Sequence, residues 1–290
     1  MLIFIAIGFF LRKINVFKSG YSEAVSSVLV WVFLPLYTFR MLSRNFVVSV
    51  IEDKLTYFVT GVLVLAIMFL VALILSRLYT RNKGEEGVYV YAFSAPNFSY
   101  MGLAIIETLL GASALHNATV FTLGLTVFIG SVGIYLITPR NKASLAAIFN
   151  PVIIATIAGM IFGLCRIPVP ALLNNVTDAS TCCIMPCAML VAGMVAAEKT
   201  FLKVFLNHKA YTASVIRLLL IPLLLFVVLK VAGINKDIIF VAVAIMGMPV
   251  DFNVIVFPKA YGGDATLGTQ LAVISNILAI ITLPLLIGLL

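Results

Sequence analysis

Residues 246–253 read MGMPVDFN, and residues 92–102 read AFSAPNFSYMG. Each stretch places a proline inside a long apolar run and follows it at once with small polar residues. Proline removes a backbone donor and clashes with the preceding turn, so it interrupts a helix. In hydrocarbon the freed backbone groups need partners, and unwound helix centres are tolerated where they line a cavity or a binding site. The two stretches therefore predict two discontinuous membrane helices.

The rest of the composition is that of a membrane protein. The chain has 290 residues, of which 63% are hydrophobic and 10% charged, whereas soluble domains carry roughly 25% charged residues. The apolar runs are continuous and do not alternate with period two, which predicts helices and not a β-barrel. The net charge of +8 comes from basic residues between the runs, a topology pattern that does not indicate nucleic acid.

We predict an all-α polytopic membrane protein with about ten transmembrane helices. Their ranges are 1–17, 21–42, 55–79, 87–111, 116–138, 148–165, 171–196, 207–233, 238–260 and 266–290. The first is short, because apolar residues reach only Leu11 before Arg12 and Lys13. Two explanations stay open: native residues precede Met1, or the two basic side chains extend to the interface from a helix that continues through Phe17.

The two halves of the chain share four landmarks at nearly one offset. These are Pro35 with Pro186, Pro96 with Pro249, residues 13–14 with 166–167, and residues 111–115 with 263–267, all 151 to 153 positions apart. Each half holds five predicted helices, so the second half enters the membrane from the opposite side. This predicts two inverted repeats, 1–138 and 148–290, joined by a short cytoplasmic linker at 139–147, as in secondary transporters. The alternative is an unrelated bundle that prolines merely kink.

The distribution of basic residues predicts the orientation. Twelve lie in the loops after odd-numbered helices, and six lie in the loops after even-numbered helices. Cytoplasmic loops carry an excess of Lys and Arg. We therefore expect a multi-pass protein of the cell membrane with the odd loops in the cytoplasm and both termini outside it.

Asp251 is the only carboxylate deep within a predicted span. A carboxylate inside a membrane is costly and marks a functional site by default. Asp251 is thus a candidate for proton or cation coupling, or a partner of Arg217. The alternative is a structural ion pair or a hydrogen-bonded aspartate without a transport role.

Neutral polar residues accompany the two breaks. The half-helix after each break points partial positive charge at this place, which suits an anionic group. Amide side chains offer both donors and acceptors, although they also join membrane helices to one another. The candidate substrate-binding residues are Asn97, Ser99, Asn253 and Asn276, and the helix-break residues are Pro96 and Pro249.

Arg217 lies about ten residues into the predicted helix 207–233. Two interpretations stay open: its side chain extends toward the Lys209 end of the helix, or it is the counter-ion of an anionic substrate. Cys183 and Cys187 are one turn apart without a nearby His or carboxylate, so we interpret them as packing residues. No metal site and no cofactor are expected, apart from H+ or Na+ as a coupling ion.

Several stretches resemble the auxin efflux carrier family, in particular its bacterial members, which are related to the plant PIN carriers. They read PVDFN at 249–253, YGGDA at 261–265, LPL at 283–285, GFFLRK at 8–13 and FLPL at 33–36. The resemblance covers essentially the whole chain. It implies that helices 4 and 9 cross at their breaks, that helices 1, 2, 6 and 7 form a scaffold, and that helices 3–5 and 8–10 form a transport domain.

The same resemblance implies a permease or efflux carrier for a small organic anion such as a carboxylate, working by elevator-like alternating access. Two departures limit it: only residues 139–147 stand where plant members have a long loop, and the helix predicted at 55–79 lacks their carboxylate. A sodium-coupled symporter of the bile-acid-carrier type and a non-transporting ligand sensor remain alternatives. The chain is not expected to be an enzyme, because it lacks a His-Glu-x-x-His pair and a second buried aspartate. The expected partners are the lipid bilayer, the anion and a second copy of the chain as in related dimers.

Overall fold

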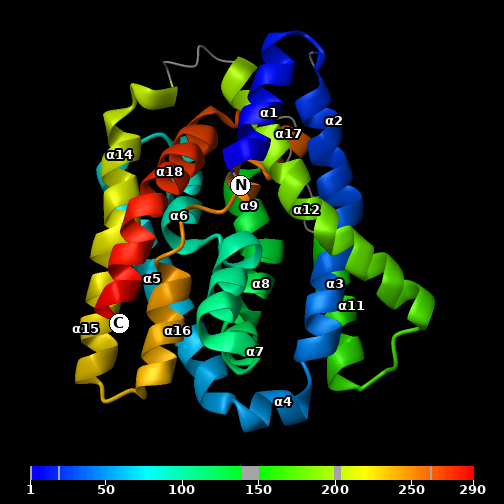
Figure 1. The fold of residues 1–290 in the computed structure, drawn as a ribbon, viewed down its shortest axis with the longest axis vertical. Coiled ribbons are helices and arrows are strands. Elements are labelled where there is room, and N and C mark those ends of the chain that lie inside the picture. Colours follow the sequence, from blue (N-terminus) through cyan, green and yellow to red (C-terminus); the bar gives the residue numbers. More distant parts are fainter. Residues whose placement is uncertain (1, 19, 139–149, 199–203, 262) are drawn as a thin grey trace. The chain divides into compact units, whose positions relative to one another are not determined.

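The computed structural model describes residues 2–18, 20–138, 150–198, 204–261 and 263–290, and the regular elements within these ranges are helices (Figure 1). In chain order they are α1 (Leu2–Lys13), α2 (Tyr21–Val28), η1 (Leu29–Phe33), α3 (Leu34–Asn45), α4 (Val48–Asp53), α5 (Leu55–Tyr79), α6 (Lys83–Ser94), η2 (Phe98–Gly102), α7 (Leu103–Phe121), α8 (Leu123–Phe128), η3 (Ile129–Gly133), α9 (Ile134–Ile137), α11 (Pro151–Leu164), α12 (Ala171–Glu198), α14 (His208–Val215), η5 (Ile216–Leu220), α15 (Ile221–Val231), α16 (Lys236–Met246), α17 (Asn253–Ala260) and α18 (Thr266–Leu289). The segments η1, η2, η3 and η5 are π-helical turns.

Six helical segments in the described part of the chain are long and apolar enough to cross a membrane. They are Tyr21–Asn45, Leu55–Tyr79, Leu103–Phe121, Ala171–Glu198, His208–Val231 and Thr266–Leu289, and two shorter apolar segments are Leu123–Ile137 and Pro151–Leu164. The prediction of an all-α protein with several membrane spans is confirmed. The arrangement of ten helices as two inverted repeats stays a prediction.

Several predicted helix ranges agree closely with the structure. The helix 55–79 is predicted to the residue, and α12 and α18 end within two residues of their predicted ends. The predicted boundary between the helices 87–111 and 116–138 is present as a backbone break at Gly111 within α7, where φ is 79°. The first helix was predicted too long: α1 ends at Lys13, because Asn15 has a positive φ of 59°. The predicted linker 139–147 lies outside the described residues.

Prolines explain two of the π-helical turns. The N–H of Ile221 donates to the carbonyl of Ile216, five residues back, immediately before Pro222. The segment η1 stands in the same way before Pro35. Because proline has no N–H and its ring clashes with the carbonyl four residues back, the helix accommodates an extra residue just ahead of it.

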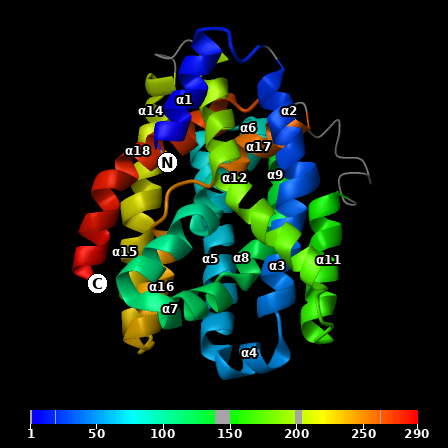
Figure 2. The same cartoon turned by 45° about the vertical axis from the view of Figure 1, so that its right-hand side comes forward.

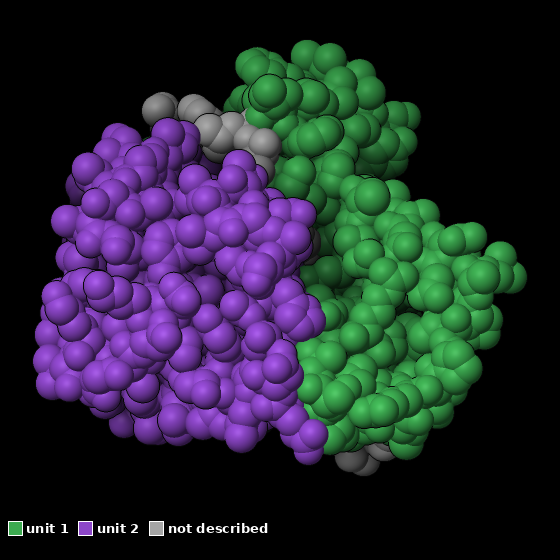
Figure 3. All heavy atoms as spheres, turned by 60° about the horizontal axis from the view of Figure 1, so that its bottom comes forward, with its two compact units in different colours: residues 1–50, 126–206, 252–269 green, residues 51–125, 207–251, 270–290 purple. Residues whose placement is uncertain are grey.

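The chain forms two compact units, which Figure 3 distinguishes by colour. Unit 1 consists of residues 1–50, 126–206 and 252–269, and unit 2 consists of residues 51–125, 207–251 and 270–290. Each unit takes segments from both halves of the sequence. These units are defined by which residues contact one another, whereas the predicted repeats are defined by sequence similarity. The two repeats, and the division into a scaffold and a transport domain, therefore stay predictions.

Close backbone contact holds the helices of unit 1 together. Helix α1 packs along α12, and α3 packs along α11 (Figures 1 and 2). A Cβ atom added to Gly193 would meet the carbonyl oxygen of Ile5, and one added to Gly8 would meet that of Leu190. Small residues let membrane helices approach this closely, and dispersion forces between the backbones then stabilise the pair.

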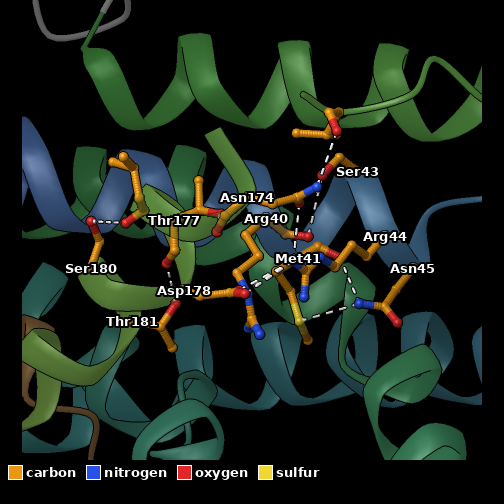
Figure 4. A network of polar contacts seen from close by, with 12 residues as sticks. Arg40, Met41, Ser43, Arg44, Asn45, Asn174, Thr177, Asp178, Ser180 and Thr181 are labelled. Atoms are coloured by element: carbon orange, nitrogen blue, oxygen red, sulfur yellow. Dashed lines mark hydrogen bonds and ion pairs between the residues drawn. The ribbon is translucent and has the colours of Figure 1, made fainter. Parts of the chain in front are cut away.

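A polar network joins α3 to α12 within unit 1 (Figure 4). Arg40 donates to Asp178, and Arg44 lies 3.2 Å from the same carboxylate. Arg44 also donates to the side-chain oxygen of Asn174 at 3.0 Å. The Asp178 side chain is 46% exposed, so this network lies at the surface of its unit.

Glycine contacts and an apolar cluster organise unit 2. Helix α5 packs against α6 and α7, and a Cβ on Gly61 would meet the carbonyl oxygen of Phe121. A buried cluster of Leu218, Met248, Ala279 and Leu283 joins η5 and α18 to the residues just before Pro249. This cluster places η5 against the second of the two interrupted helices.

Candidate functional site: a crossing of two broken helices

Both predicted helix breaks are present, and they pair with each other within unit 2. Helix α6 ends at Ser94, and η2 begins at Phe98. Helix α16 ends at Met246, and α17 begins at Asn253. Between these ends, Pro96 and Val250 form an antiparallel β-bridge. The two unwound segments therefore run side by side in opposite directions.

Main-chain hydrogen bonds fix the crossing. The N–H of Asn97 donates to the carbonyl of Pro249 at 2.8 Å, and the N–H of Asp251 donates to the carbonyl of Ala95 at 3.4 Å. All four of these residues are buried. Backbone groups freed by the two prolines thus find protein partners, as buried backbone in a membrane protein must.

Helix α18 supports the crossing from a third direction. The N–H of Val250 donates to the hydroxyl oxygen of Ser275 at 3.1 Å. The side-chain amide of Asn276 donates to the carbonyl of Ala272 at 2.8 Å, with a longer contact of 3.4 Å to the carbonyl of Val250. Asn276 was predicted as a substrate-binding residue, and in this structure its amide nitrogen holds backbone carbonyls.

The carboxylate of Asp251 is buried at the crossing. The side chain is 1% exposed, and its Oδ2 accepts a hydrogen bond from the hydroxyl of Tyr91 at 2.8 Å. Sequence reasoning missed Tyr91 and also Ser275. A signal for Tyr91 was present, because it precedes Ala95 by four positions and so lies on the face of α6 that ends at the break.

Asn97 has the most unusual environment at the crossing. Its side chain is fully buried, and within the described part of the chain neither Oδ1 nor Nδ2 has a hydrogen-bond partner. A buried polar group without a partner costs about 1–3 kcal/mol. Asn97 directly precedes Phe98, where the second half-helix begins and its N-terminal dipole favours negative charge. The amide is therefore placed as a ligand-binding group would be.

The remaining predicted residues are placed differently. Ser99 is half-buried within η2 of unit 2. Asn253 is buried at the first position of α17 and belongs to unit 1. The structure thus gathers Asn97, Asp251 and Asn276 around one pair of backbone segments in unit 2.

Arg217 is fully buried in η5 of unit 2. None of its three guanidinium nitrogens has a hydrogen-bond partner among the described residues. The interpretation that its side chain extends toward the aqueous end of the helix does not agree with this burial, because a side chain that reached water would be exposed. The Asp251 carboxylate accepts a hydrogen bond from Tyr91 and none from Arg217.

Another basic residue, Lys259, is partly buried in unit 1 at the end of α17. Its Nζ donates to Glu23 at 2.9 Å and to Glu198 at 2.8 Å. Ser22 donates to Glu198 at 2.8 Å, and Arg12 lies 3.9 Å from the same carboxylate. We refer to Lys259, Glu23, Glu198, Ser22 and Arg12 as the Lys259 network. It joins α17 to the ends of α1, α2 and α12, and it was not predicted from the sequence.

Comparison with known proteins identifies the family. A family model described as membrane transport protein matches residues 1–147 and 140–287. The chain belongs to this family, the auxin efflux carriers. It is also 20% identical over 98% of its length to an uncharacterized transporter, YfdV, of Escherichia coli strain K12, and covers 94% of that protein. Proteins of the same name from Escherichia coli O157:H7 and Shigella flexneri give the same values. The chain is thus a multi-pass membrane transporter of the auxin efflux carrier family, as its sequence predicted.

Proposed function

We propose that this chain is a secondary-active transporter of a small organic anion such as a carboxylate, and that the anion binds at the crossing of the two broken helices. The observation that carries the proposal is the side chain of Asn97, which is fully buried and has no hydrogen-bond partner among the described residues. Its amide can donate two hydrogen bonds to a carboxylate. The N-terminus of the half-helix that begins at Phe98 adds a favourable dipole.

Asp251 is our candidate for the coupling residue. It is a buried carboxylate in the same backbone pair as Asn97, and Tyr91 holds its Oδ2 by a hydrogen bond of 2.8 Å. A carboxylate in this position repels an anionic substrate unless a proton or a cation neutralises it. Binding of H+ or Na+ at Asp251 would therefore favour binding of the anion at Asn97, and the two would be transported together.

The transport cycle we propose is elevator-like alternating access in a ten-helix protein of two inverted repeats. The site would move with the predicted helices of residues 55–138 and 207–290. These would move against a scaffold made of the predicted helices 1–17, 21–42, 148–165 and 171–196. We place the protein in the cell membrane with both termini outside the cytoplasm, because basic residues are more numerous in the odd-numbered loops. A homodimer is the assembly we propose for it.

The test is transport by the purified full chain in liposomes. Transient currents are recorded on adding single small carboxylates, with the pH gradient and the sodium gradient imposed separately and in both directions. The variants are Asn97→Ala and Asp251→Asn. The matched controls are Asn45→Ala, at the end of α3, and Asp237→Asn, an exposed carboxylate in the first turn of α16.

We expect a carboxylate-dependent current that falls about tenfold or more in Asn97→Ala, since a lost hydrogen bond to a charged group costs about 1.5–3 kcal/mol. Asp251→Asn should abolish the dependence on the coupling gradient, and both controls should behave as wild type. A current that survives both substitutions would remove the site from the crossing. Dependence on sodium alone would favour the symporter alternative, and carboxylate binding without any current in folded protein would favour a sensor.

A further inference from the structure

Arg217 is placed near the middle of a membrane span. The span His208–Val231 contains it, and Arg217 follows His208 by nine residues. At about 1.5 Å per residue this is about 14 Å along the helix, close to half of a hydrocarbon core of about 30 Å. Its side chain is fully buried inside the protein. A basic side chain at this depth is costly and calls for a partner.

The described residues supply no such partner. Nε, Nη1 and Nη2 of Arg217 all lack a hydrogen bond within the described ranges. Arginine cannot relieve the cost by losing its proton, because its guanidinium stays charged in proteins. Burial of an ion outside water costs several kcal/mol unless an opposite charge compensates it. The missing component is therefore a negative charge that the described side chains do not provide.

The position of η5 relates this cation to the crossing. Leu218, the next residue, packs in one cluster with Met248, which directly precedes Pro249. Met101 of η2 packs against the same cluster. Both broken helices thus approach the turn that carries Arg217.

We propose that Arg217 is the cationic pole of a buried anion site in unit 2, and that it binds a singly charged anionic group. The group is either the carboxylate of a substrate or a small inorganic anion such as chloride. A guanidinium forms two parallel hydrogen bonds with a carboxylate, whereas chloride accepts them as a point charge. The substrate alternative rests on the proposed function, and the chloride alternative does not.

The test measures binding and does not need transport. The melting temperature of the purified full chain is measured in detergent, first with a bulky organic sulfonate as the only anion. Sodium chloride or sodium acetate is then added at matched ionic strength. The variants are Arg217→Met and Arg217→Lys. The control is Arg77→Met, which removes an arginine of unit 2 whose side chain is 77% exposed.

We expect one of the two salts to raise the melting temperature of the wild type and of Arg77→Met by several degrees, as a ligand of the folded state does. Stabilisation by chloride identifies the inorganic ion, and stabilisation by acetate alone identifies a carboxylate. Arg217→Met should lose this response and should melt higher than the wild type in the bulky sulfonate, because it no longer buries an unpaired charge. Arg217→Lys keeps the positive charge but cannot form the two parallel hydrogen bonds of a guanidinium. Its melting temperature should therefore rise with chloride but much less with acetate.

Two results would overturn the proposal. One is an equal response of the wild type and Arg217→Met to either salt, and the other is no response of folded wild type to both salts. Transport is recorded separately for the same variants. Stabilisation by an anion that depends on Arg217, in a protein that transports nothing, would overturn the proposed function and support the anion site. Transport and anion stabilisation that are both unchanged in Arg217→Met would overturn the anion site and leave the proposed function intact.

Discussion

Lys259 in unit 1, which is partly buried, and Arg217 in unit 2, which is fully buried, are two basic residues with opposite surroundings. Lys259 is held by two carboxylates, those of Glu23 and Glu198, and its side chain is 13% exposed. Arg217 is fully buried and has no hydrogen-bond partner in the described part of the chain. The difference teaches that burial alone does not define a functional charge. We interpret Lys259, whose counter-ions are in place, as a structural contact, and the ligand proposed above is our explanation for Arg217, which lacks them among the described residues.

The polar residues around the two cations follow the same division. In unit 1 the Lys259 network pairs two basic side chains with two acidic ones, so its charge is balanced. In unit 2 the Asn97 side chain is also without a partner among the described residues. Unit 1 also holds single buried atoms without a hydrogen bond, such as Ser26 Oγ and Arg12 Nε, but the two side chains whose several polar atoms all lack a partner within the described ranges, Arg217 and Asn97, both lie in unit 2.

The largest effect on stability is expected for Lys259→Met. This variant leaves Glu23 and Glu198 close together without their shared cation. Removing one partner of a fully buried ion pair costs about 3–5 kcal/mol, and we expect about 3 kcal/mol here because the network is partly exposed. Unfolding in detergent, followed by temperature or denaturant, measures it. Lys209→Met is the control, because Lys209 is exposed and donates to a single carbonyl, that of Tyr79. Equal losses of stability in Lys259→Met and Lys209→Met would show that the Lys259 network does not contribute to the stability of the fold.

Tyr91→Phe should come next. It removes the hydroxyl that donates to the buried carboxylate of Asp251, and a lost hydrogen bond to a charged group costs about 1.5–3 kcal/mol. The same unfolding measurement applies, with Tyr135→Phe, at an exposed tyrosine, as control. If Asp251 is the coupling residue, the variant should also shift the pH dependence of transport. A stable variant with unchanged transport would assign Tyr91 no part in coupling.

The two acids of the Lys259 network should differ from each other. The Glu198 side chain is 19% exposed and the Glu23 side chain is 45% exposed. We expect Glu198→Gln to cost about 1–2 kcal/mol and Glu23→Gln less than about 1 kcal/mol, because water screens the more exposed pair. Comparing the two single variants with the double variant measures their coupling through Lys259. A larger loss for Glu23→Gln would contradict the burial argument.

Asp178→Asn should have the smallest effect. Its contacts with Arg40 and Arg44 look similar to the Lys259 network, but the side chain is about half exposed and exchanges its partners with water. We expect a melting temperature unchanged within the reproducibility of the measurement, at both low and high salt. A marked loss of stability would mean that exposure is a poor guide to the strength of ion pairs in this protein.

Local features of the fold were predictable from the sequence. The helix Leu55–Tyr79 is an uninterrupted apolar run with polar residues at its end, and its range was predicted to the residue. Pro96 and Pro249 predicted the two helix breaks, because proline interrupts the hydrogen bonding of a regular helix. The short helix Val48–Asp53 was missed, since it lies in a loop and has no apolar periodicity to mark it.

Contacts between distant residues were not predictable in this way. Lys259 and Glu23 are 236 positions apart, and nothing in either local pattern indicates the other. A carboxylate at the end of a helix, such as Glu198, is ordinarily solvated by water, so its position in the sequence does not indicate a contact with Lys259. The pairing of Tyr91 with Asp251 was missed for the same reason: 160 positions separate the two residues, and only Asp251 was predicted as a site residue.

The β-bridge between Pro96 and Val250 changes what the two prolines mean for motion. A proline in a membrane helix is ordinarily a place where the helix bends. Here the N–H of Asn97 and the N–H of Asp251 are both tied to the opposite segment, and α18 holds Val250 as well. Bending at either proline would break these bonds between buried groups. The amide protons of Asn97, Val250 and Asp251 should therefore be among the slowest of the chain to exchange with deuterium, which makes the two interrupted helices stiffest where they are interrupted.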